Sequence, residues 1–211
     1  RLLGTNTAPT IKVKNSNITI NQGAKFNPLD YVTASDVEDG NLTSEIKVKS
    51  SNVNVNKPGT YQVTYEVTDQ DGVETDASIT VHVNAYPTIN AGNIVVQEGD
   101  KNFDPLKGVT ADDLEDGNGV DKVTVKSSNV DVDKPGTYQV TYEVTDKDGA
   151  TTDKTVSVLV NAAPTIEAGN IVVQEGDKNF DPLKGVTADD LEDGNGVDKV
   201  TVKSSNVDVD K

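Results

Sequence analysis

One property constrains the fold of this chain more than any other: the sequence repeats itself. Residues 91–134 recur without a single change at residues 168–211, which is 77 positions further along the chain. A more divergent earlier copy keeps an aromatic residue and two acids at the same spacing (Phe26, Asp36 and Asp69 correspond to Phe103, Asp113 and Asp146). A period of this length is typical of an array of similar domains. We therefore predict three repeats, at residues 8–85 (repeat 1), 86–162 (repeat 2) and 163–211 (repeat 3).

Repeat 3 is shorter than the other two. It stops at Lys211, which corresponds to Lys134, and it has no counterpart of residues 135–162. We expect this incomplete repeat to be unable to close its own core, and to be poorly ordered or completed by strands exchanged with another molecule. The opening RLLGTNTAPT is typical of an interior fragment or a mature product, so we expect any targeting signal to lie outside it.

Apolar and polar residues alternate with the period of a β-strand. In GTYQVTYEVTD, Tyr61, Val63, Tyr65 and Val67 fall on one face and the polar residues on the other. The same alternation occurs over residues 17–20, 78–83 and 138–144, and valines extend it through residues 123–132. Turn dipeptides such as Pro-Gly and Asp-Gly separate these segments, and no helix-length segment has helical apolar spacing.

Short strands in a unit of this length favour an immunoglobulin-like sandwich. We therefore predict an all-β chain of tandem immunoglobulin-like β-sandwiches with Greek-key connections, in which repeat 3 is incomplete. The buried tyrosines would fill the core while their hydroxyl groups reach backbone acceptors near the ends of the sheets.

The composition excludes several classes of function. A net charge of −16 argues against binding to nucleic acid or to anionic lipid, because both require clustered Lys and Arg. No apolar run approaches the ~20 residues of a membrane-spanning helix, so we expect no membrane insertion in this fragment. The absence of cysteine excludes disulfides, thiol catalysis and thiolate metal sites.

Two motifs carry a specific resemblance: Asp36-Val37-Glu38-Asp39-Gly40-Asn41 and Gly59-Thr60-Tyr61. With the flanking PTI and KPGTYQVTYEVTD segments, they resemble the bacterial immunoglobulin-like repeats of Gram-positive cell-surface proteins, which are also found in some pesticidal crystal proteins. The resemblance covers repeats 1 and 2 and the first half of repeat 3. It implies extracellular, secreted or wall-anchored proteins in which such modules form stalks or adhesive arrays, and it implies no catalytic activity.

Each repeat contains an acidic loop whose side chains are candidate calcium ligands. Calcium takes about six to eight oxygen ligands from carboxylates, amides, carbonyls and water. The candidates in the three repeats are Asp36, Glu38, Asp39 and Asn41; Asp113, Glu115, Asp116 and Asn118; and Asp190, Glu192, Asp193 and Asn195. A second acidic turn at residues 69–72, matched at 146–149, would share the ion if the fold brings the two turns together.

The same loop has a plainer explanation as a solvated turn. Asp-Gly is a favoured turn dipeptide, and Asp and Asn stabilise bends by accepting hydrogen bonds from their own backbone. The spacing also differs from an EF-hand, because Leu114 occupies the third position of a loop that starts at Asp112. The sequence leaves both explanations open and indicates no other cofactor.

The sequence offers little for catalysis, and we expect no enzyme activity. The only histidine, His82, falls on the outward face of its strand and is replaced by Leu159 in repeat 2. Adjacent acids on an exposed turn also lack the apolar pocket that raises a carboxyl pKa in glycosidases.

Two further possibilities concern lysines and tyrosines. A covalent cross-link between a first-strand lysine and a last-strand Asn or Asp would use Lys12 or Lys14, but repeat 2 has no lysine there. Tyr31 and Tyr86 are the tyrosines that remain as surface aromatic residues for sugar binding, and they have no aligned counterparts in the other repeats.

The sequence thus predicts a non-catalytic spacer or stalk module of a bacterial surface protein, with neighbouring repeats as its immediate partners. The alternative is an adhesin repeat or accessory module that binds a host protein or a polysaccharide.

Overall fold

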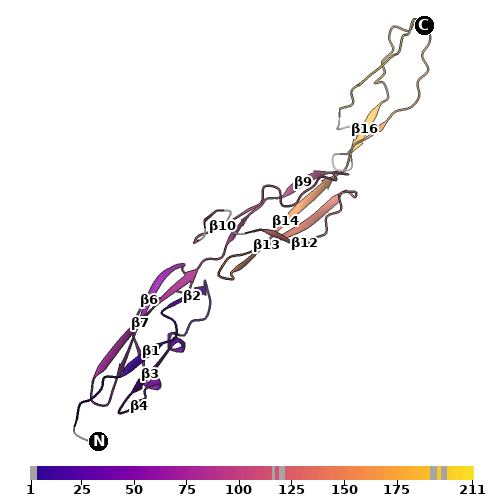
Figure 1. Cartoon of the computed structure of the whole chain (residues 1–211). Helices are drawn as coiled ribbons and strands as arrows, with labels where there is room; N and C mark the ends of the chain where they lie inside the picture. The colour runs from indigo at the N-terminus through magenta and orange to yellow at the C-terminus, as the bar shows by residue number, and fades with distance from the viewer. Residues whose placement is uncertain (1–3, 116, 119–121, 191–193, 196–198) are drawn as a thin grey trace. The chain divides into compact units, whose positions relative to one another are not determined.

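The computed structural model describes residues 4–115, 117–118, 122–190, 194–195 and 199–211, without the side chains of 117–118 and 194–195 (Figure 1). Apart from two short 3-10 helices, η1 (Pro28–Tyr31) and η2 (Thr43–Glu45), the regular elements of these residues are β-strands. The prediction of an all-β fold is therefore confirmed. Among the described residues, no helix has both the length and the apolar character needed to cross a membrane.

Residues 10–84 form two sheets. The first has the order β1 (Thr10–Val13), β3 (Val32–Asp36), β4 (Gly40–Asn41). The second has the order β2 (Asn17–Asn21), β7 (Glu74–Asn84), β6 (Gly59–Thr68), β5 (Lys47–Ser51). The chain passes between the sheets from β1 to β2, from β2 to β3 and from β4 to β5. All pairs are antiparallel except β2 and β7, which run parallel.

The core of repeat 1 lies between the inward faces of these two sheets, as expected for an immunoglobulin-like β-sandwich. Every second residue of β6 points inward, and Val63, Tyr65 and Val67 are at most 1% exposed. The buried core residues are Ile18, Val32, Ala34, Leu42, Ile46, Val63, Tyr65, Val67, Ile79 and Val81. Each fully buried aliphatic side chain contributes about 1.5–3 kcal/mol, so the period-two pattern is the main source of stability.

The tyrosine hydroxyl groups are satisfied as the sequence predicts. Tyr65 donates to the backbone oxygen of Pro28 at 2.5 Å, and Tyr61, which is half-buried, donates to that of Lys57 at 2.6 Å. A buried hydroxyl needs such a partner, because desolvation without one is costly. These bonds also attach η1 and the turn before β6 to the sheet.

Residues 88–161 repeat this arrangement. One sheet has the order β11 (Gly117–Asn118), β10 (Thr110–Asp113), β8 (Thr88–Asn90). The other has the order β12 (Thr124–Ser128), β13 (Gly136–Thr145), β14 (Thr151–Asn161), β9 (Ile94–Gln97). β14 pairs with β9 in parallel, as β7 pairs with β2.

One predicted strand segment is wrong. The valine pattern extends through residue 132, but β12 ends at Ser128, and the next residues form a loop and a turn. In this loop the backbone oxygen of Val132 accepts from Gly99 N–H at 2.7 Å, a contact with a distant turn rather than with a neighbouring strand.

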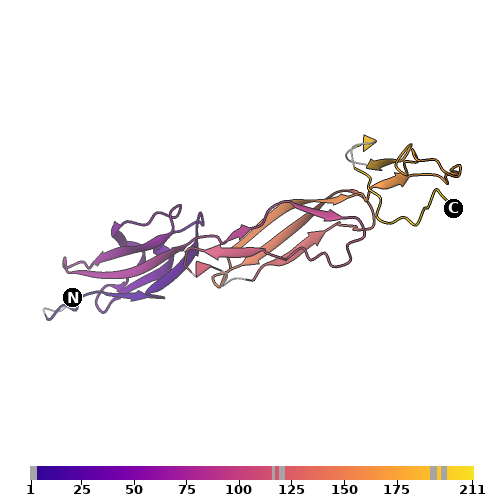
Figure 2. The same ribbon diagram turned by 90° about the horizontal axis from the view of Figure 1, so that it is seen from above.

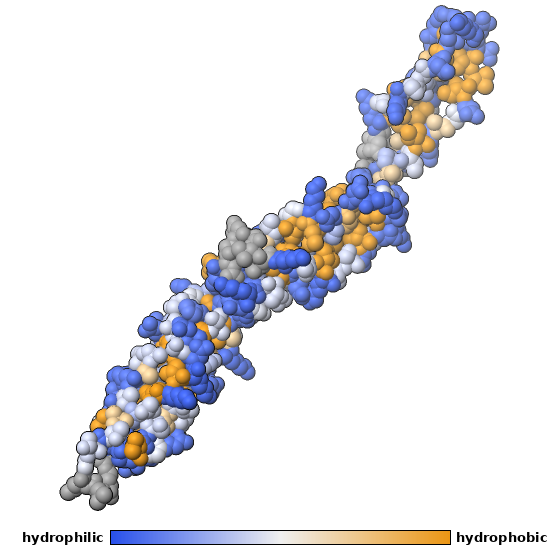
Figure 3. All heavy atoms as spheres, viewed as in Figure 1, coloured by the Kyte–Doolittle hydropathy of each residue, from blue (hydrophilic) through white to orange (hydrophobic). Residues whose placement is uncertain are grey.

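The described part of repeat 3 has only three short strands: β15 (Thr165–Glu167), β16 (Thr187–Asp190) and β17 (Gly194–Asn195). They form one sheet in the order β15-β16-β17, and the remaining described residues are loops and turns (Figure 2). Apolar side chains remain exposed here, and Figure 3 shows hydrophobic residues at the surface of this C-terminal part. The most exposed are Ile166, Ile171, Val172 and Val207.

Contacts within the chain define two compact units. Residues 1–90, 108–124 and 142–154 belong to the first, and residues 91–107, 125–141 and 155–211 belong to the second. The acidic loops of repeats 1 and 2 both lie within the first unit.

Candidate functional site

The acidic loop of repeat 1 is the tight connection between β3 and β4. Asp36 pairs with Gly40 across the hairpin, which leaves three residues in the loop. Gly40 adopts a φ of 79°, a left-handed conformation that glycine tolerates best, as is typical of three-residue hairpin loops. Asp36 Oδ1 accepts hydrogen bonds from the backbone N–H groups of Glu38 (2.8 Å) and Asp39 (3.0 Å). One carboxylate oxygen of Asp36 therefore shapes the turn, and the other does not.

The second acidic turn connects β6 to β7. Asp69 Oδ1 accepts from the backbone N–H groups of Asp71 and Val73, each at 2.9 Å. Gly72 has a φ of 84° and donates to the backbone oxygen of Asp69 at 3.0 Å. Asp69 is only 5% exposed, so its carboxylate organises the turn from within.

The structure brings these two turns together. Asp39 Oδ2 accepts from the backbone N–H of Gln70 at 2.8 Å. Carboxylate oxygens of Asp36, Asp39 and Asp69 all lie within 4.8 Å of one another. We call Asp36, Asp39 and Asp69 the acidic cluster of repeat 1.

Sequence reasoning missed one residue at this cluster. Asn6 Nδ2 donates to Asp69 Oδ2 at 2.8 Å, and Asn6 Oδ1 is buried without a hydrogen-bond partner. A sequence pattern marks this asparagine: Asn-x-x-Pro precedes the first strand of each repeat, beginning at Asn6, Asn84 and Asn161.

The other two candidate ligands of repeat 1 bind backbone groups. Glu38 Oε1 accepts from Thr7 N–H at 2.7 Å, and Asn41 Oδ1 accepts from Thr43 N–H at 2.9 Å. The structure therefore groups Asp36 and Asp39 with Asp69 and Asn6, rather than with Glu38 and Asn41.

The described residues of repeat 2 reproduce part of this arrangement, with Asn84 in the place of Asn6. Asn84 Nδ2 donates to Asp146 Oδ2 at 2.8 Å, and Glu115 Oε1 accepts from Ala85 N–H at 2.7 Å. Asp113 Oδ1 accepts from Glu115 N–H at 3.0 Å. Burial, together with a hydrogen bond shared with the Asp113 carboxylate, raises the pKa of Glu115 above its ordinary value.

Several candidate ligands lie outside the described residues. These are Asp116, Glu192 and Asp193, and the side chains of Asn118 and Asn195. In repeat 3, Asp190 is described and is 8% exposed, close to the values of Asp36 and Asp113.

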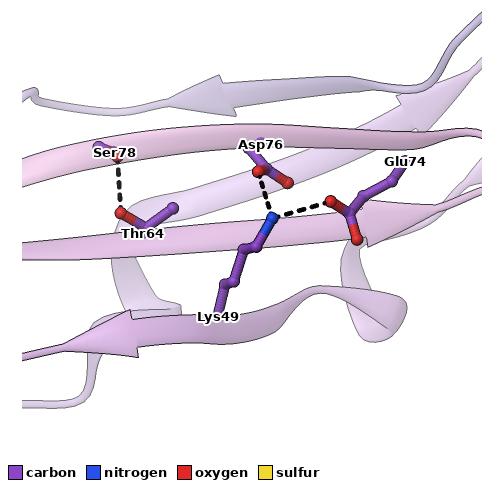
Figure 4. A network of polar contacts seen from close by, with 5 residues as sticks. All are labelled: Lys49, Thr64, Glu74, Asp76 and Ser78. Carbon is purple, nitrogen blue, oxygen red and sulfur yellow. Dashed lines mark hydrogen bonds and ion pairs between the residues drawn. The ribbon is translucent and has the colours of Figure 1, made fainter.

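A second group of acids, on the outer face of the sheet of repeat 1, is built differently (Figure 4). Lys49 Nζ lies 2.7 Å from Asp76 Oδ2 and 3.0 Å from Glu74 Oε2. These hydrogen bonds raise the pKa of Lys49 above its ordinary value and lower that of Asp76, and a hydrogen bond with Glu74 raises the pKa of Glu66. The ammonium group of Lys49 supplies positive charge to these acids. Lys49 and the acids therefore form an exposed ion-pair network.

Most of the remaining candidates form hydrogen bonds or pack within repeat 1. His82 Nδ1 lies 3.0 Å from Thr60 Oγ1 on the outer face of the sheet. Tyr31 is not the free surface aromatic that the sequence suggested, because it stacks on Phe26 with ring centroids 5.7 Å apart and packs against the core. Tyr86 is 46% exposed, and Lys14 Nζ donates to the backbone oxygen of Asp30.

The chain is similar to known bacterial proteins. It is 40% identical over 215 residues to pesticidal crystal protein Cry22Aa of Bacillus thuringiensis, covering 96% of this chain and 29% of that protein. It is 34% identical over 144 residues to the C protein alpha-antigen of Streptococcus agalactiae serotype Ia, covering 62% of this chain and 12% of that protein. The chain thus spans less than a third of the length of either relative.

Among solved structures, a similar chain is the M60 catalytic domain with the CBM51-1 and CBM51-2 domains of Clostridium perfringens ZmpB. It shares 18% identity with a TM-score of 0.35, over 77% of this chain and 32% of that chain.

A family model described as "Bacterial surface protein, Ig-like domain" matches residues 10–83 and 87–160. These two segments span nearly all of both β-sandwiches and include the acidic loops of repeats 1 and 2. The chain therefore belongs to the family of bacterial surface protein Ig-like domains.

Proposed function

We propose that this chain is a non-catalytic spacer of a secreted or wall-anchored bacterial surface protein. In that role its repeats would hold other parts of the protein away from the cell wall. Such a role requires a stable core in each repeat and a surface that does not adhere to its neighbours. It requires no specific ligand.

The observation that best supports this proposal is the comparison of β7 with β14. The three central inward positions stay aliphatic and almost fully buried in both repeats (Ile79, Val81, Val83 and Val156, Val158, Val160). Two outward positions change in chemical character (Glu74 and His82 correspond to Thr151 and Leu159), whereas Asp76 is kept as Asp153 and Ser78 is replaced by another hydroxyl residue, Thr155. A binding face shared by the repeats would have to keep its outward side chains, whereas a spacer would not.

The outward residues of β6 and β13 are identical, but they are small or polar and interact across the sheet. Thr64 Oγ1 lies 2.9 Å from Ser78 Oγ in repeat 1 (Figure 4), and Thr141 Oγ1 lies 2.7 Å from Thr155 Oγ1 in repeat 2. The net charge of −16 would also limit adhesion between neighbouring copies. An eleven-residue strand such as β7 is roughly 36 Å long, which sets the scale of the reach that one repeat adds.

A replacement experiment tests the spacer role. The chain is displayed on a Gram-positive cell between a wall anchor and an N-terminal epitope, and antibody binding to the epitope is measured on intact cells. Deleting residues 10–160 should lower antibody binding several-fold. Replacing them with two unrelated β-sandwich domains of similar length should restore it, because only length and stability matter to a spacer. Failure of the unrelated domains to restore antibody binding would contradict the proposal.

One observation favours the alternative, a binding module for a host protein or polysaccharide. Val37 and Leu114 occupy the same position of the acidic loop in repeats 1 and 2, and they are 80% and 77% exposed. An apolar side chain kept exposed at one place in both repeats is a candidate contact for a partner. In the display experiment, native repeats that retain host cells or polysaccharide, with loss of retention in the double variant Val37→Ser and Leu114→Ser, would support this alternative.

We further propose that repeat 3 pairs with strands equivalent to β13 and β14 from another molecule. The exposed apolar residues of repeat 3, such as Ile171 and Val172, support this proposal. A labelled peptide with the sequence of residues 135–162 should therefore bind the full chain in an anisotropy titration. A peptide carrying Tyr142→Asp and Val144→Asp should not bind, because those two side chains are fully buried in repeat 2. Equal behaviour of the two peptides would contradict strand completion.

A further inference from the structure

Repeat 1 contains two groups of three acids, and only one of them is matched by a lysine. Lys49 lies between Glu74 and Asp76 in the exposed group. In the acidic cluster, neither Asp36 nor Asp39 has a Lys or Arg partner within the part of the chain that the structure describes. Carboxylates this close together repel one another, and burial strengthens the repulsion because it lowers the local dielectric constant.

Buried oxygen atoms provide a second, independent observation. Asp36 is 6% exposed, and its Oδ2 atom is buried without a hydrogen-bond partner. The Oδ1 atom of Asn6, whose Nδ2 atom donates to Asp69, is also buried without a hydrogen-bond partner. Buried polar atoms in native proteins are nearly always paired, so two such oxygens beside one cluster favour the binding of an electropositive ligand.

The described residues of repeat 2 reproduce the asparagine and its supporting contacts. Asn84 is 2% exposed and donates from Nδ2 to Asp146, and its Oδ1 atom is buried without a hydrogen-bond partner. The supporting bond is also reproduced, because Ala85 N–H donates to Glu115 as Thr7 N–H donates to Glu38, each at 2.7 Å. In each of the two repeats, an asparagine that precedes the first strand therefore donates to an acidic turn and keeps a buried amide oxygen without a hydrogen-bond partner.

We propose that each arrangement binds one calcium ion, held in repeat 1 by Asp36, Asp39, Asp69 and the amide oxygen of Asn6. Every donor is an oxygen, and three are carboxylates, which is the ligand set that calcium prefers. Transition metals would favour imidazole or thiolate, but the chain has no cysteine and its one histidine is on the opposite end of β7. Calcium binding at these residues is independent of the spacer function.

Calcium bound in this way would connect three segments of each repeat. The asparagine comes from the segment just before the first strand, Asp36 and Asp39 come from the β3–β4 loop, and Asp69 comes from the β6–β7 turn. In repeat 2 the corresponding asparagine, Asn84, is the last residue of β7. Calcium would therefore attach the end of one repeat to the two acidic turns of the next.

Amide hydrogen exchange of the full chain, followed by mass spectrometry, tests this proposal. The reporting segments are residues 69–73 for the first site and 146–150 for the second, because their sequences differ and their peptides can be told apart. Amide protons in these segments exchange when the segment opens locally, and bound calcium makes that opening rarer. Calcium chloride at about 100 times its dissociation constant should therefore lower the exchange rate by up to about 100-fold relative to the rate in chelator. Magnesium chloride should protect much less, because magnesium requires a smaller and stricter octahedral site.

Variants assign the effect to individual sites. Asn6→Ala should remove calcium protection from residues 69–73 only, and Asn84→Ala should remove it from residues 146–150 only, so each variant is a control for the other. Asp36→Asn keeps the oxygen that shapes the turn but removes the charge, and it should behave like Asn6→Ala. Asp100→Asn is a matched control, because Asp100 also accepts a turn hydrogen bond, from Asn102 N–H, but lies on an exposed turn.

The outcomes are decisive in either direction. Segment-specific loss of protection in Asn6→Ala and Asp36→Asn, with full protection in Asp100→Asn, would establish the first site. No calcium effect on the unmodified chain, or an effect that survives Asp36→Asn, would overturn the proposal. Equal protection by magnesium would overturn the assignment to calcium.

Discussion

Tyr65→Ala is expected to lower the free energy of unfolding of repeat 1 by about 4 kcal/mol, because removal of a buried aromatic ring costs about 3–5 kcal/mol. Tyr65 is fully buried in β6, between the two sheets. The substitution also removes the hydrogen bond to Pro28, which fixes η1. Urea unfolding of the full chain, followed by NMR signals of residues 59–84, measures the loss.

Tyr65→Phe is the matched control for this prediction. It keeps the ring and loses only the hydroxyl group, so it should cost about 1 kcal/mol, the usual net value of one hydrogen bond. A similar loss in Tyr65→Phe and Tyr65→Ala would show that the hydroxyl contact, and not the ring, is the main contribution.

The same side chain affects stability at alkaline pH. Burial, with a smaller effect of Tyr31, raises the pKa of Tyr65 to about 12. An unfolded tyrosine ionises near pH ~10, so the unfolded state loses its proton first as the pH rises. Stability should therefore fall between about pH 10 and 12. Tyr65→Phe should lack this part of the loss.

Asp146→Ala is expected to destabilise repeat 2 by about 3 kcal/mol in the presence of chelator, because each buried donor left unpaired costs about 1–3 kcal/mol. Asp146 is 5% exposed and accepts from the backbone N–H groups of Asp148 (3.0 Å) and Ala150 (2.9 Å). It also accepts from Asn84 at 2.8 Å. Ala150 and Asn84 are almost fully buried, so water cannot replace the lost acceptor for either of them. Unfolding followed by signals of residues 136–161 measures the effect.

Asp148→Ala is the control in the same turn. Its side chain is exposed, so the change should be within about 0.5 kcal/mol, as for most surface substitutions. If Asp146→Ala were as mild as Asp148→Ala, the buried carboxylate would not be the organiser of the turn. Because the measurement is made in chelator, it separates this structural role from calcium binding.

Local patterns predicted much of the fold. The alternation in GTYQVTYEVT predicts a half-buried strand, and β6 and β13 have that alternation of buried and exposed residues. The valines at 130 and 132 follow the same pattern but are not in a strand, and the backbone oxygen of Val132 accepts from Gly99 N–H in a distant turn. A period-two pattern predicts which side chains point inward. It does not predict which backbone groups form hydrogen bonds with a neighbouring strand.

In the acidic loop, too, local contacts follow from the sequence and distant contacts do not. The turn bonds of Asp36 span two and three residues, and the residue types Asp, Asn and Gly are sufficient to predict them. Glu38 and Asn41 are equally acceptable as ligands by residue type and spacing. Their engagement with Thr7 and Thr43 is visible only in the folded chain.

The repeats, the strand alternation and the acidic turns can be recognised in the amino-acid sequence, because each depends on identity or on spacing over a few residues. The hydrogen bond from Gln70 to Asp39, 31 residues away, and that from Asn6 to Asp69, 63 residues away, become visible only in the folded chain. The reason is that these contacts depend on how the two sheets face each other. A one-dimensional pattern contains the turn chemistry of each loop, but not the packing that brings two loops and a preceding asparagine to one place.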